Sequence, residues 1–169
     1  QILADRVAEG MRKAWENTEK MTISAADVAW QVEPVALPVS EHLDEDALMA
    51  TVKDESAKPD ARFHAAKDLI WLRRCQAGDT IDVGCLALGK ARVLHLPGEL
   101  FVEYQLAAQK VRPDLFVAMA AYGDYAMGYI GTEIAYSQGG YETGPTASHV
   151  APAVERTLTD AMAKLLNQE

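Results

Sequence analysis

The stretch Val93-Leu94-His95-Leu96-Pro97-Gly98-Glu99-Leu100 decides how this chain folds. A short apolar run ends at a Pro-Gly pair, and a second apolar segment begins directly afterwards. This order predicts a strand that ends at a turn and is followed by a helix, with Glu99 in the first helical turn. There the Glu99 carboxylate would lie near the positive end of the helix dipole, which favours an acid.

A second apolar run, residues 115–121, is short enough for a buried strand. It leads into a segment with many tyrosines, because five of the six tyrosines lie between residues 122 and 144. Large rings with a polar tip suit a loop that lines a pocket. We therefore expect this tyrosine-rich segment to be the second part of a functional site.

These two parts carry a resemblance to a known family. Leu96-Pro97-Gly98-Glu99 after a strand, followed by Tyr129-Ile130-Gly131-Thr132-Glu133-Ile134-Ala135-Tyr136-Ser137-Gln138-Gly139-Gly140-Tyr141-Glu142, resembles the late part of the neutral/alkaline non-lysosomal ceramidase catalytic domain. The resemblance spans roughly Val93 to Thr146. In that family a Pro-Gly-Glu turn gives one zinc ligand and a tyrosine in a Tyr-x-x-Thr-x-x-x-Tyr loop gives another. By position, the resemblance implies zinc ligation by Glu99 and Tyr136.

The chain also departs from the family pattern. The family's other zinc ligands are two histidines from earlier parts of a longer domain, and its proposed nucleophile is a serine that also lies earlier. None of those motifs is visible, and the histidines of this chain have no metal-ligand spacing. The helix expected after Glu99 also lacks the arginines typical of the family. The resemblance thus implies half of a zinc site, which is filled only if another part of the protein supplies the remaining ligands.

From the residues alone, each candidate has a simpler interpretation. Glu99 is equally explained as an acid that complements a helix dipole. Tyr136 is explained as a loop tyrosine that packs by its ring and bonds through its hydroxyl. His95 lies four residues before Glu99, but the turn between them predicts a strand histidine satisfied within the sheet.

Length and composition bound the class of protein. The 169 residues, 49% of them hydrophobic, are enough for one folded domain with a core. The net charge of -9 argues against nucleic-acid binding. No apolar run approaches the roughly 20 residues of a membrane span, and no signal-peptide pattern precedes the first helix.

Gln1 in place of an initiator Met indicates a processed product or a fragment. Cys75 and Cys85 are expected to be buried thiols, or a pair in an exported protein.

Hydrophobic periodicity and turn residues predict the remaining elements. We expect an amphipathic helix over residues 2–20 that docks on the domain, and an edge strand within residues 22–39, which contain Pro34 and Pro38. The other predictions are a short helix within 40–54, a helix over 61–76 capped by Asp60, a hairpin of 79–88 with 90–96 and a last helix over 154–166.

The predicted fold is α+β or α/β, a mixed β-sheet with packed helices. Residues 1–169 would form a single domain or the C-terminal segment of a larger ceramidase-like domain. The leading hypothesis is a segment of a zinc-dependent amidohydrolase that contributes Glu99 and Tyr136 and associates with the remainder of the parent polypeptide or another chain. The resemblance further implies an exported or extracytoplasmic protein. The alternative is a non-catalytic binding or structural module whose tyrosine-rich loop is a contact surface.

Overall fold

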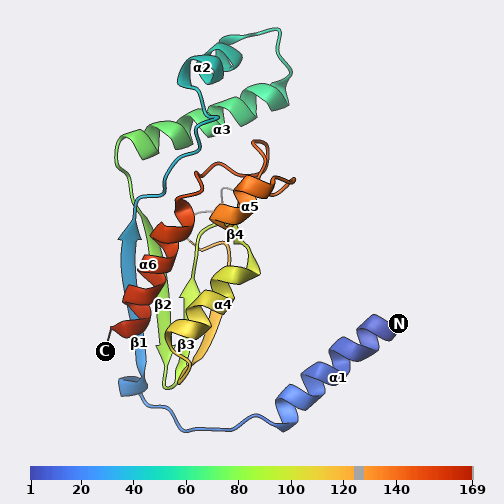
Figure 1. Ribbon diagram of the computed structural model, residues 1–169, viewed down its shortest axis with the longest axis vertical. Coiled ribbons are helices and arrows are strands. Elements are labelled where there is room, and N and C mark those ends of the chain that lie inside the picture. The colour runs from blue at the N-terminus through green and yellow to red at the C-terminus, as the bar shows by residue number, and fades with distance from the viewer. Residues whose placement is uncertain (124–127, 169) are drawn as a thin grey trace.

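The fold is built on a four-stranded mixed sheet in the order β1-β2-β3-β5 (Figure 1). The computed structural model describes residues 1–123 and 128–168, so Tyr125 of the tyrosine-rich segment lies outside the described part. The strands are β1 (Val28–Val35), β2 (Ile81–Leu88), β3 (Ala91–His95) and β5 (Phe116–Ala120). β1, β2 and β3 are antiparallel, whereas β3 and β5 are parallel. This sheet with helices confirms the predicted α+β class.

Strands β2 and β3 form the predicted hairpin. Leu88 pairs with Ala91 across a two-residue turn, and Gly89 takes a φ of 56°. Such a turn needs a left-handed backbone at its first central residue, which glycine adopts without strain. The hairpin therefore follows from local sequence alone.

Strand β1 lies at the edge of the sheet, where Pro34 is tolerated because its missing N–H faces no neighbouring strand. Its last residue, Val35, pairs with Ile81, the first residue of β2. Residues 36–80 therefore leave the sheet and return to it at the same point.

The segment that leaves between β1 and β2 carries two helices, α2 (Glu45–Lys53) and α3 (Pro59–Gln76). Asp44 caps α2 by accepting a hydrogen bond from the backbone N–H of Ala47 at 2.8 Å. The predicted cap of the next helix was wrong, because α3 begins at Pro59, and Asp60 lies inside its first turn.

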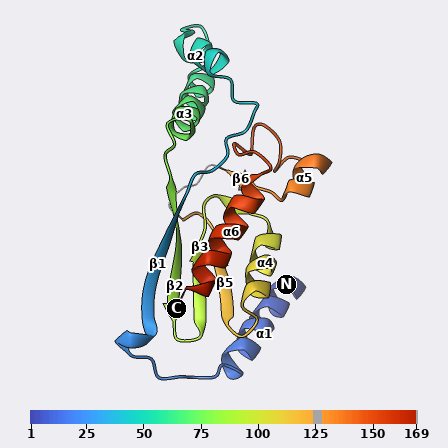
Figure 2. The ribbon, with the colours of Figure 1, turned by 60° about the vertical axis from the view of Figure 1, so that its left-hand side comes forward.

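Two helices, α4 (Val102–Val111) and α6 (Val154–Asn167), pack beside each other on one face of the sheet (Figures 1 and 2). The predicted apolar stripe of α6 is confirmed. Its buried residues are Val154, Leu158, Ala161, Met162, Leu165 and Leu166. They meet the buried side chains of the sheet, which include Val83, Cys85 and Leu94, each 0% exposed. The core thus lies between this helix pair and one sheet face.

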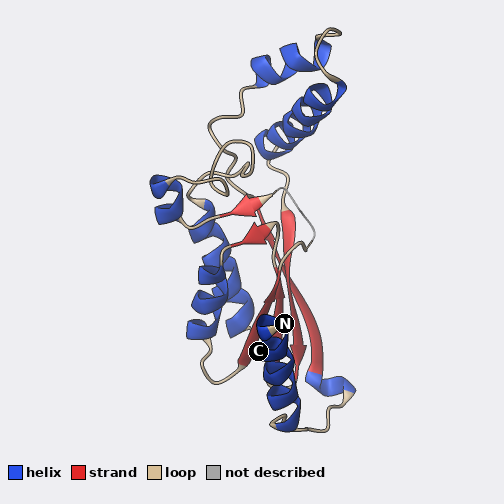
Figure 3. Cartoon of the chain, turned by 90° about the vertical axis from the view of Figure 1, so that its right-hand side faces the viewer, coloured by secondary structure: helices blue, strands red, loops and turns tan. Residues whose placement is uncertain are grey.

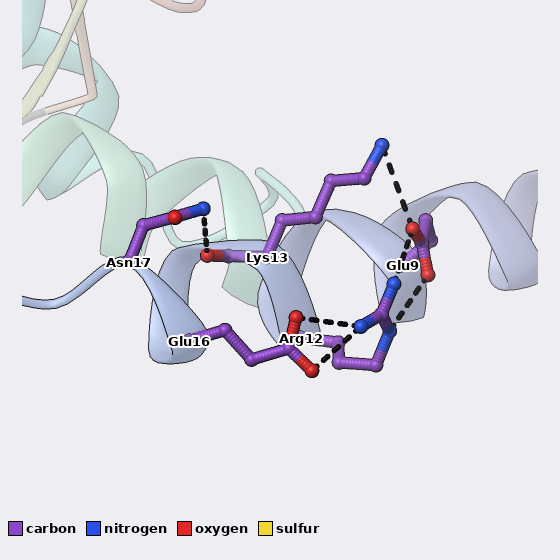
Figure 4. Close-up of polar contacts among 5 residues, drawn as sticks. All are labelled: Glu9, Arg12, Lys13, Glu16 and Asn17. Atoms are coloured by element: carbon purple, nitrogen blue, oxygen red, sulfur yellow. Dashed lines mark hydrogen bonds and ion pairs between the residues drawn. The ribbon is translucent and has the colours of Figure 1, made fainter.

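Helix α1 (Ile2–Glu16) stands away from the sheet, so its predicted docking was wrong for the described chain. None of its residues is buried, and its apolar stripe, from Ile2 to Trp15, faces outward. Figure 4 shows what holds the helix locally: Arg12 pairs with Glu9 at 2.7 Å and with Glu16 at 2.6 Å. Exposed pairs of this kind contribute little to stability, because solvent and salt screen both charges. The Lys20 ammonium lies 5.6 Å from the centroid of the Trp15 ring, and the apolar residues of the stripe stay exposed in the described chain.

Both cysteines are free thiols and not a disulfide pair, and of the two only Cys85 is buried as expected. Cys85 is buried in β2 and Cys75 is half-buried on α3, and burial raises the pKa of each thiol. Of the described helices, none combines the length and the apolar character that crossing a bilayer requires.

Candidate functional site

The turn that follows β3 places Glu99 beside a distant part of the chain. Gly98 has a φ of 62°, and a Cβ there would lie 2.7 Å from the carbonyl oxygen of Gly128. The Glu99 N–H donates to that same oxygen at 2.9 Å. Glycine is therefore required at position 98, both for the left-handed backbone and for the close approach.

Glu99 lies in a short strand, which corrects the expectation of a helical position. Strand β4 (Glu99–Leu100) pairs in parallel with β6 (Tyr129–Ile130), and α4 begins only at Val102. The acid in the first turn of α4 is Glu103. Glu99 and Glu103 therefore do not lie on one helix. The position of Glu99 is set by its pairing with β6, and the helix dipole plays no part in it.

Two tyrosine hydroxyls surround the Glu99 carboxylate. The Tyr122 hydroxyl donates a hydrogen bond to Oε2 of Glu99, which raises the pKa of Tyr122 to about 12. The negative charge of Glu99 also raises the pKa of Tyr129, its neighbour across β4 and β6. Both residues stay protonated beside the acid because ionisation would place two negative charges together.

Parallel pairing explains why Glu99 and Tyr122 meet. β3 and β5 run side by side in the same direction and end at His95 and Ala120. The segments that follow them emerge at the same edge of the sheet, and the Tyr122 N–H donates to the Gly98 carbonyl at 2.9 Å. Tyr122 has a φ of 54°, a left-handed conformation that costs a non-glycine residue about 1 kcal/mol or more.

Tyr136, the second candidate ligand, lies on a helix and not in a loop. Thr132 caps this helix, α5 (Glu133–Gln138), with its hydroxyl 3.3 Å from the Ala135 N–H. The Tyr136 hydroxyl is 2.7 Å from Oγ of Ser148, a residue only 2% exposed. Ser148 therefore fixes the direction of the phenol oxygen.

The Glu99 and Tyr136 positions are joined through Gly128. Gly128 accepts the backbone hydrogen bond of Glu99 on one side and forms a bridge with Ser148 on the other. Its φ is 81°, and a Cβ there would lie 2.2 Å from the Ala147 carbonyl oxygen. Among the described residues, however, no hydrogen bond or ion pair links Glu99 directly to Tyr136.

The donor atoms of Glu99 and Tyr136 decide whether the site suits zinc. A carboxylate and a phenol are both oxygen donors, and catalytic zinc takes three protein ligands with nitrogen, sulfur or oxygen donors. Within the described ranges, no three His, Cys, Asp or Glu side chains gather in a way that would hold a metal. One buried polar atom near Tyr136, Oγ1 of Thr143, has no hydrogen-bond partner among the described residues. Glu99 and Tyr136 would provide two oxygen donors, which is fewer than the three protein ligands of a catalytic zinc site.

Two of the histidines have contacts with other parts of the chain. His95 lies on β3 with its ring 5.0 Å from that of Trp30, in keeping with the expected strand histidine. His149 is 5% exposed, and its Nε2 lies 3.1 Å from Oδ1 of Asp68 on α3. The carbonyl of His149 accepts from the Trp71 indole at 3.0 Å. His149 therefore anchors α3 to the segment after the tyrosines.

Beside this anchor is a hollow of about 340 Å³ between α3 and residues 145–149. It is lined by His64, Lys67, Asp68, Pro145, Thr146 and His149. No tyrosine of the tyrosine-rich segment is among these lining residues, so this hollow is not the pocket that the sequence predicted. Sequence reasoning missed Tyr122, Ser148 and Asp68, because no local spacing relates them to Glu99, Tyr136 and His149.

Comparison with known proteins identifies the fold. No family profile and no curated protein matches the chain. Among solved structures, the neutral ceramidase from Pseudomonas aeruginosa matches with a TM-score of 0.55 at 14% identity, over 92% of this chain and 30% of that one. A ceramidase complexed with C2 gives a TM-score of 0.47 at 16% identity, over 80% of this chain and 26% of that one. The chain therefore has a ceramidase-like fold and spans under a third of those proteins.

Proposed function

We propose that this chain is a segment of a ceramidase-like, zinc-dependent amidohydrolase, to which it contributes Glu99 and Tyr136 as metal ligands. The observation that carries the proposal is the convergence of the two positions on Gly128, which bonds to Glu99 and pairs with Ser148, the partner of Tyr136. The ceramidase-like fold supports it. When bound, zinc would polarise an amide carbonyl and activate water.

The residues around the ligands have supporting roles in this proposal. Tyr122 donates to one oxygen of Glu99 and so orients the carboxylate. Ser148 does the same for the Tyr136 oxygen from a position that is almost fully buried. Partners that hydrogen-bond to metal ligands set their orientation and commonly matter 10–100-fold for affinity.

The remaining histidine ligands and the nucleophile would come from the remainder of the parent polypeptide or from another chain. This part of the proposal rests on the length of the chain, which matches only 30% of the Pseudomonas enzyme. An exported location is proposed on the same family grounds. Two side chains alone do not complete a tetrahedral site, so the isolated chain is expected to hydrolyse nothing.

The test is zinc content, measured by elemental analysis of the full gene product together with the intact mass of every polypeptide. We expect about one zinc per complete assembly, and an affinity for zinc at least tenfold lower in Glu99→Ala and in Tyr136→Phe. Glu103→Ala is the matched control, because Glu103 is an exposed acid four residues away on α4. Equal zinc in Glu99→Ala and the control would refute the proposal.

One observation favours the alternative of a non-catalytic module with an aromatic contact surface. Tyr141 is 68% exposed, and its ring lies 6.0 Å from that of Tyr129 in an edge-to-face arrangement. Exposed aromatic pairs are typical of contact surfaces. A full gene product without zinc, together with a partner whose binding is lost in Tyr141→Ala, would establish this alternative.

A further inference from the structure

The face of the sheet opposite α4 and α6 is apolar along three rows of paired residues. One row runs across the four strands through Trp30, Leu86, Val93 and Ala118. The rows on either side are Val28, Leu88, Ala91 and Phe116, and Val32, Gly84, His95 and Ala120. None of these residues is an acid, a lysine or an arginine. We call this surface the open face.

The open face is exposed in the described chain. Phe116 is 70% exposed, Trp30 56%, Val28 45% and Val32 38%. Figure 1 shows α4 and α6 beside the sheet and α1 standing off from it, and Figure 3 shows helices along one side of the strands. A sheet with one side in water usually alternates apolar and polar residues along each strand. Here β2 from Val83 to Leu88 and the whole of β5 are apolar on both sides, which is the pattern of strands that are buried on both faces.

Trp30 shows that this surface is organised as a packing surface. Its indole lies across β2 over Gly84, where a Cβ would come within 2.5 Å of the ring, and its edge meets His95 on β3 at 5.0 Å between centroids. Glycine at position 84 thus leaves room for the Trp30 ring, which extends from β1 across β2 and contacts the His95 side chain of β3. A tryptophan buries 150–250 Å² when covered, so its exposure here leaves considerable apolar area in water.

We propose that the open face is the docking surface for an apolar layer of the parent polypeptide, an inference that rests on the proposed function. Contiguous apolar patches of several hundred Å² mark interaction sites in soluble proteins. The Pseudomonas enzyme that shares this fold has more than two thirds of its length outside the matched part, which is ample to form such a layer. A second copy of this chain fits less well, since each copy carries a net charge of -9 and copies repel.

Hydroxyl-radical footprinting with mass spectrometry tests this directly. Side-chain oxidation is compared between the 169-residue chain alone and the full gene product. We expect oxidation of Trp30 and Phe116 to fall at least fivefold in the full product. Phe63 on α3 is the matched reference for dose, because it is 68% exposed and does not belong to the open face.

Other occupants give other results. Protection of Phe116 already in the isolated chain, together with a dimer in light scattering that Trp30→Glu dissociates, would identify a second copy and overturn the proposal. Protection in the isolated chain that is lost on deleting residues 1–16 would identify α1 and overturn it as well. Unprotected Trp30 and Phe116 in the full product would overturn it outright.

The outcome is separable from the zinc proposal. If zinc is bound but Trp30 and Phe116 remain reactive, the docking surface is wrong and the metal site stands. If both residues are protected but no zinc is bound, the docking surface stands and the metal site is wrong. Glu99→Gln is expected to leave the footprint of the open face unchanged.

Discussion

The Tyr122 hydroxyl donates a hydrogen bond to the Glu99 carboxylate, although 22 residues separate the two in the chain. The contact exists because the segments after β3 and β5 emerge at the same sheet edge. It couples the ionisation of the tyrosine to the charge of the acid.

Glu99→Gln is therefore expected to lower the pKa of Tyr122 from about 12 toward the ordinary tyrosine value, because the charge that opposes phenolate formation is removed. The pKa of Tyr129 falls in the same direction. Ultraviolet titration of tyrosinate absorbance measures both. The control is Glu103→Gln, which removes an exposed acid from α4 and is expected to leave the raised pKa values of Tyr122 and Tyr129 unchanged. If the tyrosines of Glu99→Gln titrate as in the unsubstituted protein, the coupling is ruled out.

Stability is expected to fall as the pH rises from about 10 toward 12. Burial raises the pKa of Tyr104, and Glu99 raises those of Tyr122 and Tyr129, so the unfolded chain loses these protons first. The stabilisation is complete below about pH 10, where both states are protonated. Urea unfolding between pH 8 and pH 11.5 measures the fall.

Tyr104→Phe separates the buried tyrosine from the other two. It loses the hydrogen bond to the Gly131 carbonyl, at 2.9 Å, and we expect a cost of about 1–3 kcal/mol at pH 8. The difference in the free energy of unfolding between the variant and the unsubstituted protein is expected to be smaller at pH 11. The unsubstituted protein loses stability there because the pKa of Tyr104 is raised in the folded state, and the variant has no such group. A gap of equal size at both pH values would contradict this linkage.

Gly128→Ala is expected to destabilise the protein far more than Gly139→Ala. Both glycines have positive φ, at 81° and 76°, so both variants incur backbone strain of about 1–3 kcal/mol. Only at Gly128 does a Cβ also meet a backbone atom, at 2.2 Å from the Ala147 oxygen, whereas nothing lies within 4 Å at Gly139. The free energy of unfolding of the two variants measures the difference, and similar values would show that the approach at Gly128 is relaxed in solution.

Deleting residues 1–16 is expected to change the free energy of unfolding by less than about 0.5 kcal/mol, because no residue of α1 is buried. Leu158→Ala on α6, by contrast, is expected to cost about 2–5 kcal/mol, since Leu158 is 0% exposed. Chemical denaturation of both variants makes the comparison. A large loss on deletion would mean that α1 packs against the body of the protein.

The sequence was sufficient for elements whose stability is local. The hairpin at Gly89 and the apolar stripe of α6 were both predicted, because turn chemistry and periodicity act over a few residues. The ceramidase-like fold was also predicted, from the residues around Glu99 and Tyr136. The matched enzyme shares this fold at 14% overall identity.

Elements that depend on distant partners were predicted poorly. Glu99 was expected in a helix, but pairing of β4 with β6 holds it in a strand, and that partner lies 30 residues away. Tertiary pairing of this kind overrides local propensity. The contacts of Ser148 with Tyr136 and of Asp68 with His149 likewise join residues that no sequence period relates. The docking of α1 was wrong for another reason: its amphipathic pattern requires a partner but does not say which molecule supplies it.

The pairing of Val35 with Ile81 has an evolutionary consequence. Because residues 36–80 depart and return at adjacent points, their length and content can change between relatives without altering the register of β1 and β2. A short turn in their place would still close the same antiparallel pair, at the cost of the contact between Asp68 and His149 and of the core contacts of this segment, among them those of Leu37, Leu43, Trp71 and Leu72. The two-helix excursion is thus a place where lineages of this fold can diverge, while the strands that lead to Glu99 keep their alignment.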